Sequence, residues 1–422
     1  MHILVEPSDY LLRNAGDMAM LQVALERFSG LWPDAKIQVL SDDPENLAML
    51  SSAAVPLSGL GREILLTRNA SLLRALGRVA PVLTPFARPR SPKFVERILR
   101  LRRNKDHPHI RSIAAFTAAV RDADVIVVTG MGGITDGFPA YADGVLEALD
   151  LALASGPKVV AMVGQGIGPL ERPDLRAKAS AVLPRLNLIA VREKRTSVPL
   201  LRSLGVPADR IVVTGDDAVA LAYDQRAEGG SGIGLNVRQS PYSAVDDRSL
   251  SAARAVIASF AAEHAAPLIP VPISFVPDEM DLEAVARNFD IDDAEVRRAI
   301  DLRRPADVIK QIQRCRVVIT GSYHAAVFAL STGIPAIGLA RSSYYIDKFC
   351  GLADMFGAGC EVVQIDTEGN YAPALQAAMT SLWENSDRLR PSLYERAAQQ
   401  IAAGKAAYAL LKTYTPSSQV QP

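Results

Sequence analysis

Hydrophobic and polar residues follow two alternating patterns along most of the chain. Short runs rich in Val, Ile and Leu, typical of buried strands, are separated by longer stretches with helical periodicity. The strands predicted in the first half are His2–Val5, Lys36–Leu40, Asp124–Thr129, Lys158–Val163, Leu188–Arg192 and Arg210–Thr214. The helices predicted between them include Met18–Phe28, Tyr141–Ala154 and Thr196–Leu204. This alternation predicts a mainly parallel sheet with helices on both faces.

The second half repeats the pattern after a polar, Gly-rich stretch, DQRAEGGS, at residues 224–231. Its predicted strands are Ile233–Arg238, Pro267–Ile273, Val317–Thr320, Ala336–Leu339 and Glu361–Ile365. We therefore expect an α/β protein with two doubly wound, Rossmann-like domains that face each other across a cleft. The first domain is predicted to span residues 1–225 and the second residues 231–385. A C-terminal helix within 386–415, with its pattern over Leu393–Thr413, is expected to pack back on the first domain.

The alternation lapses between residues 51 and 111, which we interpret as a helical or irregular insertion. Its end is strongly basic, since residues 88–111 hold nine Lys and Arg against Glu96 and Asp106. A basic segment of this kind favours peripheral contact with an anionic membrane surface or with a lipid pyrophosphate-linked acceptor. The alternative is a solvated helix face.

Composition narrows the class of protein. The chain has 422 residues, 49% of them hydrophobic, and its formal net charge of +0 predicts no nucleic-acid partner. Three cysteines in a chain of this length suggest no disulfide framework and fit no zinc pattern. No apolar run reaches the roughly 20 residues that a membrane span needs. Together with an N-terminus unlike a secretory signal, these features predict a cytoplasmic protein, peripheral to a membrane at most.

His324 is the sharpest candidate for chemistry. It follows the strand Val317–Thr320 and the turn at Gly321, so it falls in the first turn of a helix at the carboxyl end of a strand. Ligands bind at such positions in open α/β sheets. An imidazole placed between a helix N-terminus and a bound anion is suited to proton transfer near neutral pH. The alternative is a core histidine hydrogen-bonded to backbone.

Glycine-rich turns follow several first-domain strands. In Asn14-Ala-Gly-Asp17, Gly16 permits close backbone approach to a ligand, while Asp17 is either a helix N-cap or an acceptor of a hydroxyl proton. Gly132 and Gly133, in Gly130-Met-Gly-Gly133, are either an anion-binding concavity or a tight turn. Gln165, between two glycines, is either an amide donor to a ligand or part of domain packing.

Two arginines end strands and are expected to point into the cleft. Arg192 follows Leu188–Val191, and Arg238 follows Ile233–Val237. A guanidinium there is suited to gripping a carboxylate or phosphate in bidentate fashion. For each of them a salt bridge is the alternative. No Asp-x-Asp motif or His/Cys cluster demands a metal, so none is expected.

The order and spacing of these motifs resemble the polysaccharide pyruvyl transferase family. The resemblance runs from Asn14-Ala-Gly-Asp17 to Tyr345–Phe349 and covers most of the chain. It implies a fold like that of two-domain GT-B glycosyltransferases. It also implies transfer of a pyruvyl group from phosphoenolpyruvate, the donor substrate, to a sugar of a cell-surface polysaccharide or its lipid-linked precursor, usually as a ketal. No cofactor is implied.

The resemblance also assigns roles to residues. Arg192 matches an arginine that holds the donor, and His324 matches the histidine of the family's Arg-Leu-His motif, in which this chain has Ser322 and Tyr323 instead. The charge of the missing arginine would then come from Arg238 or Arg341, or the donor would be different. The chemistry implied needs a proton donor, for which we expect His324, and an acceptor of the hydroxyl proton, for which we expect Asp17.

Two other functions remain open from the sequence. One is a GT-B glycosyltransferase that uses a nucleotide sugar, although no clear acidic ribose clamp is present in the second half. The other is a non-catalytic glycan-assembly protein, which the departures at Ser322 and Tyr323 favour and the retained Asp17, Arg192 and His324 oppose. Stabilisation by phosphoenolpyruvate or by a nucleotide sugar would separate the two enzymes.

Overall fold

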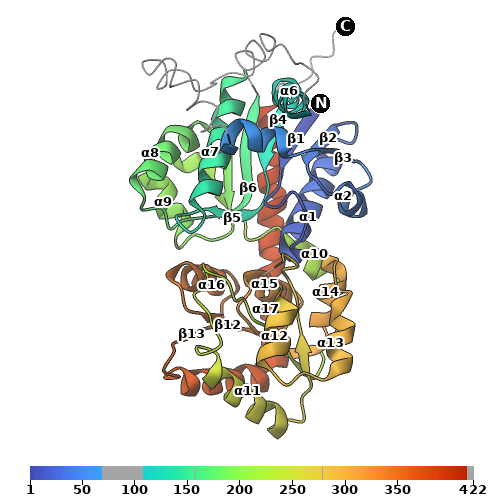
Figure 1. Ribbon diagram of the computed structural model, residues 1–422, viewed down its shortest axis with the longest axis vertical. Helices are drawn as coiled ribbons and strands as arrows, with labels where there is room; N and C mark the ends of the chain where they lie inside the picture. The colour runs from blue at the N-terminus through green and yellow to red at the C-terminus, as the bar shows by residue number, and fades with distance from the viewer. Residues whose placement is uncertain (69–107, 157, 278, 416–422) are drawn as a thin grey trace.

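The computed structural model describes residues 1–68, 108–156, 158–277 and 279–415, and it contains two parallel β-sheets, one above the other in Figure 1. The first sheet has eight strands, with the order β3-β2-β1-β4-β6-β7-β8 and β5 paired to β6. The strands are β1 His2–Glu6, β2 Lys36–Leu40, β3 Ala54–Leu57, β4 Val125–Val128, β5 Met131–Ile134, β6 Val159–Ile167, β7 Leu188–Val191 and β8 Ile211–Val213. The helical segments around it are α1 Ala15–Leu31, α2 Pro44–Leu50, α3 Leu60–Glu63, η1 Ile64–Arg68, α6 Pro108–Asp122, α7 Pro139–Ala154, α8 Pro173–Val182, η2 Leu183–Arg185, α9 Ser197–Ser203, η3 Ala208–Arg210 and α10 Ala218–Asp224.

The second sheet has five strands in the order β10-β9-β11-β12-β13. The strands are β9 Gly232–Asn236, β10 Leu268–Pro270, β11 Cys315–Thr320, β12 Ala336–Ala340 and β13 Cys360–Gln364. The helices around it are α11 Ser251–Glu263, α12 Asp281–Asn288, α13 Asp293–Ile300, α14 Pro305–Ile312, α15 Tyr323–Ser331, α16 Ser343–Phe356 and α17 Ala372–Tyr414. Strands such as β4 and β12 are buried along their whole length, as parallel strands covered by helices on both faces require.

Two strands were not expected from the sequence. β3 pairs with β2 and continues the alternation beyond residue 51, where a lapse was predicted. It is a four-residue edge strand whose two central residues are exposed, and it contains Pro56, so its sequence lacks the usual signal of a buried strand. β5 forms where the glycines Gly132 and Gly133 favoured a tight turn.

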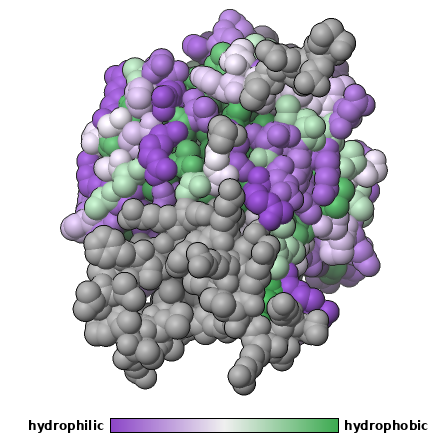
Figure 2. Space-filling model, turned by 90° about the horizontal axis from the view of Figure 1, so that it is seen from above, coloured by the Kyte–Doolittle hydropathy of each residue, from purple (hydrophilic) through white to green (hydrophobic). Residues whose placement is uncertain are grey.

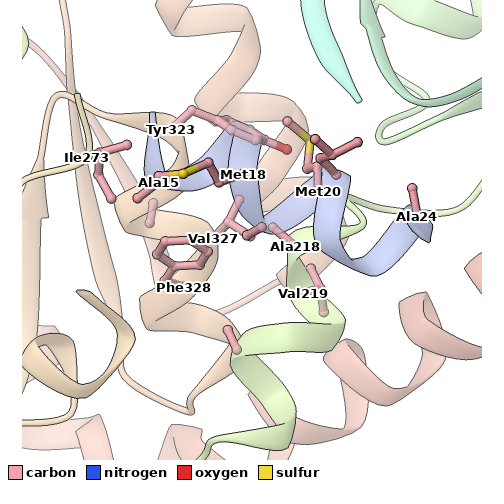
Figure 3. Packing of buried hydrophobic residues seen from close by; sticks show 14 of the residues in the cluster. Ala15, Met18, Met20, Ala24, Ala218, Val219, Ile273, Tyr323, Val327 and Phe328 are labelled. Atoms are coloured by element: carbon pink, nitrogen blue, oxygen red, sulfur yellow. The ribbon is translucent and has the colours of Figure 1, made fainter. Parts of the chain in front are cut away.

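Apolar side chains join the two domains. α1 and α10 of the first domain pack against α15 of the second, and one core cluster contains residues from all three helices. In Figure 3, Met18 and Met20 of α1 lie beside Tyr323 and Val327 of α15. A shared apolar core fixes the two domains relative to each other and holds the N-terminal ends of α1 and α15 together.

The helix α17 is longer than the sequence predicted. The expected helix within 386–415 is its second half, since α17 begins at Ala372 and continues through Pro391 to Tyr414. It starts beside the second sheet and reaches the first domain, where the Tyr408 hydroxyl donates to Asp217 at 2.8 Å (Figure 1). Midway along it, the Tyr394 hydroxyl donates to the Ala227 carbonyl of the interdomain segment at 3.5 Å.

The basic segment predicted at residues 88–111 lies largely outside the described residues, which resume at Pro108 with α6. Seen from the end of the first domain, the described surface is mainly hydrophilic with scattered hydrophobic residues (Figure 2). In the described parts of the chain, no helix combines the length and the apolar character that a membrane crossing requires. Peripheral membrane contact and a cytoplasmic location therefore stay predictions.

Candidate functional site

The site forms where the N-terminal ends of α1 and α15 meet. Asn14 caps α1, because its Oδ1 accepts hydrogen bonds from the backbone N–H groups of Gly16 and Asp17 at 2.9 and 3.2 Å. Asp17 is therefore not the cap, and its carboxylate is left to face His324. A Cβ on Gly16 would lie 1.9 Å from Cγ of His324, so only glycine permits the histidine to sit against α1. The sequence predicted that Gly16 lets the backbone approach a ligand, but the space next to Gly16 is occupied by the side chain of His324.

The imidazole of His324 lies between two carboxylates of the first domain. Its Nδ1 is 4.0 Å from Oδ1 of Asp17, and its Nε2 is 3.7 Å from Oδ2 of Asp216. Both distances exceed that of a normal hydrogen bond. Nε2 is buried and has no hydrogen-bond partner in the part of the chain that the structure describes. The described residues therefore provide no backbone hydrogen bond to Nε2 of the kind that a core histidine makes, and Nε2 keeps an unused hydrogen-bonding position.

The two carboxylates differ in their protonation. Burial raises the pKa of Asp216, but His324 and Arg192 oppose burial strongly enough that the pKa lies below its ordinary value. Asp216 therefore stays ionised. Burial also raises the pKa of Asp17, and there the opposing effects of His324 and Ser8 are too small to cancel it. Of the two, Asp17 is the carboxylate that accepts a proton more readily.

Arg192 is buried beside His324 and is oriented on two sides. Its Nη1 lies 3.2 Å from Oδ2 of Asp216, and its guanidinium stacks 4.3 Å from the centre of the Tyr323 ring. Nη2 is buried without a hydrogen-bond partner among the described residues. A Cβ at Gly132 or Gly166 would lie 2.6 or 2.7 Å from Nη2, so these two glycines make room for the guanidinium.

A pocket with an empty volume of about 350 Å³, partly open to solvent, begins at this guanidinium. Its lining residues are Gly132, Gly166, Ile167, Gly168, Arg192, Glu193, Thr196, Tyr323, Tyr344, Asp347 and Lys348. His324 is not among these lining residues. Two of them connect the pocket to it: the ring centre of Tyr323 is 5.4 Å from that of His324, and Arg192 shares the Asp216 carboxylate with His324.

Lys348 is a site residue that the sequence analysis did not single out. It lies on α16 one turn after Tyr344, and its Nζ is 3.0 Å from the Tyr344 hydroxyl, which in turn donates to the Gly132 carbonyl at 2.8 Å. Burial and the nearby Arg192 hold the pKa of Lys348 well below its ordinary value. The signal that could have identified it is its place on the helix after β12, the neighbour of the strand that precedes His324.

Other predicted residues serve the fold. The amide nitrogen of Gln165 donates to the carbonyls of Val128, Thr129 and Val163, as the packing alternative expects, and a ligand-binding role for Gln165 stays a prediction. Gly133 makes room for the ring of Tyr141, 2.4 Å from an added Cβ, and does not line the pocket.

Neither arginine proposed to replace the family arginine reaches the pocket. Arg238 is buried against Asp281, with Nε 2.9 Å from Oδ1, and lines a separate pocket of about 190 Å³. Arg341 donates to the Ala244 carbonyl at 2.7 Å and pairs with Asp246. Ser322 precedes α15 without a side-chain cap hydrogen bond, and its N–H donates to Thr320 Oγ1. A substrate-binding role for Arg238 and Arg341 stays a prediction. Lys348, unlike these two arginines, lines the same pocket as Arg192.

Comparison with known proteins identifies the family. The model of the family described as Polysaccharide pyruvyl transferase matches residues 14–343, from the cap of α1 to the start of α16. The chain belongs to the polysaccharide pyruvyl transferase family. This stretch includes Asp17, Arg192, Asp216 and His324, and it ends just before Lys348. No curated protein matches the chain.

Solved structures show that this family member has a GT-B-like fold, as predicted. A putative UDP-N-acetylglucosamine 2-epimerase from Listeria monocytogenes is 11% identical with a TM-score of 0.55, covering 100% of this chain and 98% of its own. The UDP-GlcNAc 2-epimerase from Neisseria meningitidis is 12% identical with a TM-score of 0.54, covering 98% and 99%. A glycosyltransferase from Rickettsia africae is 10% identical with a TM-score of 0.53, covering 99% of each chain.

Proposed function

We propose that this pyruvyl transferase family member transfers the pyruvyl group of phosphoenolpyruvate to a sugar hydroxyl of a cell-surface polysaccharide or its lipid-linked precursor, forming a pyruvate ketal. One observation carries the proposal. Arg192 and Lys348 line a single small pocket, and Arg192 shares the Asp216 carboxylate with His324, whose Nε2 has no hydrogen-bond partner among the described residues. Phosphoenolpyruvate carries two anionic groups on three carbons, which matches two basic side chains that line one pocket.

The two cations suit different parts of the donor. The buried Nη2 of Arg192 has no hydrogen-bond partner among the described residues, while Nη1 is held by Asp216. A guanidinium fixed in this way is prepared to bind a carboxylate or phosphate oxygen. The ammonium of Lys348 is poorly solvated where it lies, and a bound anion would restore the favourable environment that burial removes. In this proposal Lys348 replaces the charge that the chain lacks at Ser322.

The reaction begins when protonated His324 transfers a proton to the methylene carbon of phosphoenolpyruvate. The adjacent carbon becomes oxocarbenium-like, and the oxygen of a first sugar hydroxyl attacks it while its proton passes to Asp17. The bond from that carbon to the phosphate oxygen then breaks, and phosphate leaves. A second hydroxyl of the same sugar closes the ketal, and its proton returns to the imidazole. Asp17 finally releases its proton to phosphate or water.

The carboxylates support this division of roles. Asp216 stays ionised, so it offers a negative charge 3.7 Å from Nε2 whenever the imidazole carries a proton. Asp216 also pairs with Arg192, and it thereby keeps the proposed donor-binding guanidinium next to His324, the proposed acid. Asp17, whose pKa is raised by burial, is the better proton acceptor of the two.

A thermal-shift comparison tests the donor. We expect phosphoenolpyruvate to stabilise the protein and nucleotide sugars to leave it unchanged. Stabilisation by a nucleotide sugar alone would favour the alternative of a GT-B glycosyltransferase. A protein that binds phosphoenolpyruvate but releases no phosphate with any glycan acceptor would favour the alternative of a non-catalytic assembly protein.

A further inference from the structure

A second, larger hollow lies on the first domain beside Asp17. It has an empty volume of about 1030 Å³ and is open to solvent. Its lining residues are Ser8, Asp9, Tyr10, Leu11, Arg13, Asp42, Arg62, Glu63, Ala140 and Tyr141. None of these belongs to the pocket of Arg192 and Lys348. The hollow is larger and more open than that pocket, so it suits a ligand larger than a three-carbon acid.

Ser8 connects this hollow to the reacting groups. It lines the hollow, and its side chain interacts with the Asp17 carboxylate and lowers the pKa of that carboxyl group against the larger effect of burial. Asp17 in turn faces Nδ1 of His324. Ser8 therefore belongs both to the lining of the hollow and to the surroundings of Asp17, whereas the smaller pocket lies on the side of Arg192. A hydroxyl of a ligand in the hollow could approach Asp17 without crossing the donor pocket.

The charges of the lining disfavour an anionic ligand, since Asp9, Asp42 and Glu63 stand against Arg13 and Arg62. Arg62 is buried and pairs with Glu6 at 2.6 Å, and Arg13 pairs with Asp9 at 3.6 Å. Both positive charges are therefore balanced by carboxylates of the protein. The Nε atoms of Arg13 and Arg62 are nevertheless buried without hydrogen-bond partners in the described ranges. Such groups need an acceptor, which a hydroxyl oxygen can supply.

The rest of the lining offers an acceptor and an aromatic ring. Asp42 uses its Oδ1 for Ser58 Oγ and the Gly59 N–H, at 2.6 and 3.2 Å, which leaves Oδ2 for a ligand hydroxyl. The ring of Tyr10 is held against Gly59, where an added Cβ would lie 2.2 Å from the ring. A fixed aromatic face, a carboxylate oxygen and N–H donors without a free cation together match a ring that carries apolar C–H and polar hydroxyl groups.

We infer that this hollow binds the saccharide acceptor, as a neutral oligosaccharide whose reacting hydroxyls are presented to Asp17. The acceptor role rests on the proposed pyruvyl transfer, but glycan binding can be measured without it. The sugar would enter from the first domain, and the donor would enter from the cleft between α16 and β6. The two substrates would then meet at His324.

A glycan array tests this inference with the full-length protein. The probes are neutral hexose, deoxyhexose and N-acetylhexosamine oligosaccharides together with uronate-containing ones. We expect retention of neutral glycans by the wild type and at least tenfold weaker retention by Asp42→Asn, which keeps an amide oxygen for Ser58 and Gly59. Glu45→Gln is the matched control, since Glu45 is an exposed acidic residue on the neighbouring α2 outside the lining, and it should bind as the wild type does.

The inference is overturned if the wild type retains no neutral glycan, if it retains only uronate-containing ones, or if Asp42→Asn binds as Glu45→Gln does. Arg13→Ala, at another lining residue with a half-buried side chain, gives a second measurement, and unchanged retention there would also count against the inference. Thermal shift with phosphoenolpyruvate separates the two proposals. If that donor stabilises every variant while glycan retention does not depend on Asp42, the glycan site is wrong. If phosphoenolpyruvate stabilises neither the wild type nor any variant while Asp42→Asn loses glycan retention, the proposed donor is wrong and the glycan site stands.

Discussion

The Nε2 atom of His324 lies 3.7 Å from Oδ2 of Asp216, and the two residues belong to different domains. His324 is on α15, next to the second sheet, and Asp216 follows β8 of the first. The same Asp216 oxygen holds Nη1 of Arg192. The acid candidate and the donor clamp are thus brought together by one carboxylate, and only while the apolar contacts of α1, α10 and α15 hold the domains in place.

Replacing His324 by Gln should abolish the reaction while leaving donor binding intact. Loss of a positioned general acid typically costs about 10²- to 10⁴-fold in rate. We therefore expect acceptor-dependent phosphate release to fall by at least about 100-fold, while phosphoenolpyruvate still raises the Tm. His264→Gln is the control, since His264 packs against Phe260 and Trp383 away from the site. Unchanged phosphate release in His264→Gln and in His324→Gln alike would remove His324 from the mechanism.

Replacing Lys348 by Met should weaken the binding of phosphoenolpyruvate and stabilise the ligand-free protein. Loss of a hydrogen bond to a charged group costs about 1.5–3 kcal/mol, so the KM for phosphoenolpyruvate should rise roughly 10- to 100-fold. The lowered pKa of Lys348 means that the folded state disfavours the ammonium. The Tm of Lys348→Met should therefore exceed that of the wild type at neutral pH, with a difference that shrinks as pH rises toward 10.5.

The control for this substitution is Lys310→Met, because Lys310 is exposed on α14. It should change neither the KM nor the Tm in this pattern. A Lys348→Met enzyme with the wild-type KM for phosphoenolpyruvate would show that Lys348 does not bind the donor.

Replacing Asp17 by Asn should change stability in a pH-dependent way. Because the folded-state pKa of Asp17 is raised above 3.8, the folded protein binds its proton more tightly than the unfolded chain does. Stability from this group is present below pH 3.8 and is lost as pH rises through the raised pKa. The Tm of Asp17→Asn minus that of the wild type should therefore increase as the pH rises from about 4 to about 8. A difference that stays constant over this range would contradict the raised pKa of Asp17.

Replacing Gly166 by Ala should weaken the binding of phosphoenolpyruvate, because the added methyl group would displace the guanidinium of Arg192. The added Cβ would lie 2.7 Å from Nη2, and the guanidinium cannot withdraw without breaking its pair with Asp216. We expect a KM for phosphoenolpyruvate at least tenfold higher, with a stability loss of about 1–3 kcal/mol measured by denaturant unfolding. Gly30→Ala is the control, since nothing lies within 4 Å of its added Cβ in α1, and it should be neutral or slightly stabilising. A wild-type KM in Gly166→Ala would contradict this positioning.

The sequence predicted the two parallel sheets well because buried parallel strands have a simple signature. Runs such as Val125–Val128 and Ala336–Ala340 are apolar throughout, and helical patterns separate them. β3 was missed because an exposed edge strand carries no such run. The start of α17 was missed because a long helix that passes from one domain to the other changes its buried face along its length, so one stripe does not describe it.

The candidate site was predicted in part. His324 and Arg192 were identified because each sits just beyond a strand end, and Asp17 because it lies where the first helix begins; the fold brings all three together. Asp216 was not singled out, because its proximity to His324 depends on the interdomain contact. Lys348 depends on the packing of α16 against β5, where Tyr344 meets the Gly132 carbonyl, a tertiary contact that no local pattern encodes.

The passage of α17 beside the interdomain segment limits how the enzyme can open. Arg390 lies against Gly229, 2.6 Å from its added Cβ, and Tyr394 bonds to Ala227, so both chain segments that connect the domains run together next to Pro391. Pro391 also lacks the backbone N–H that would otherwise stiffen the helix at this level. The domains are therefore joined by two adjacent chain segments as well as by the apolar core of α1, α10 and α15. Together these connections hold Nε2 of His324 at 3.7 Å from Oδ2 of Asp216.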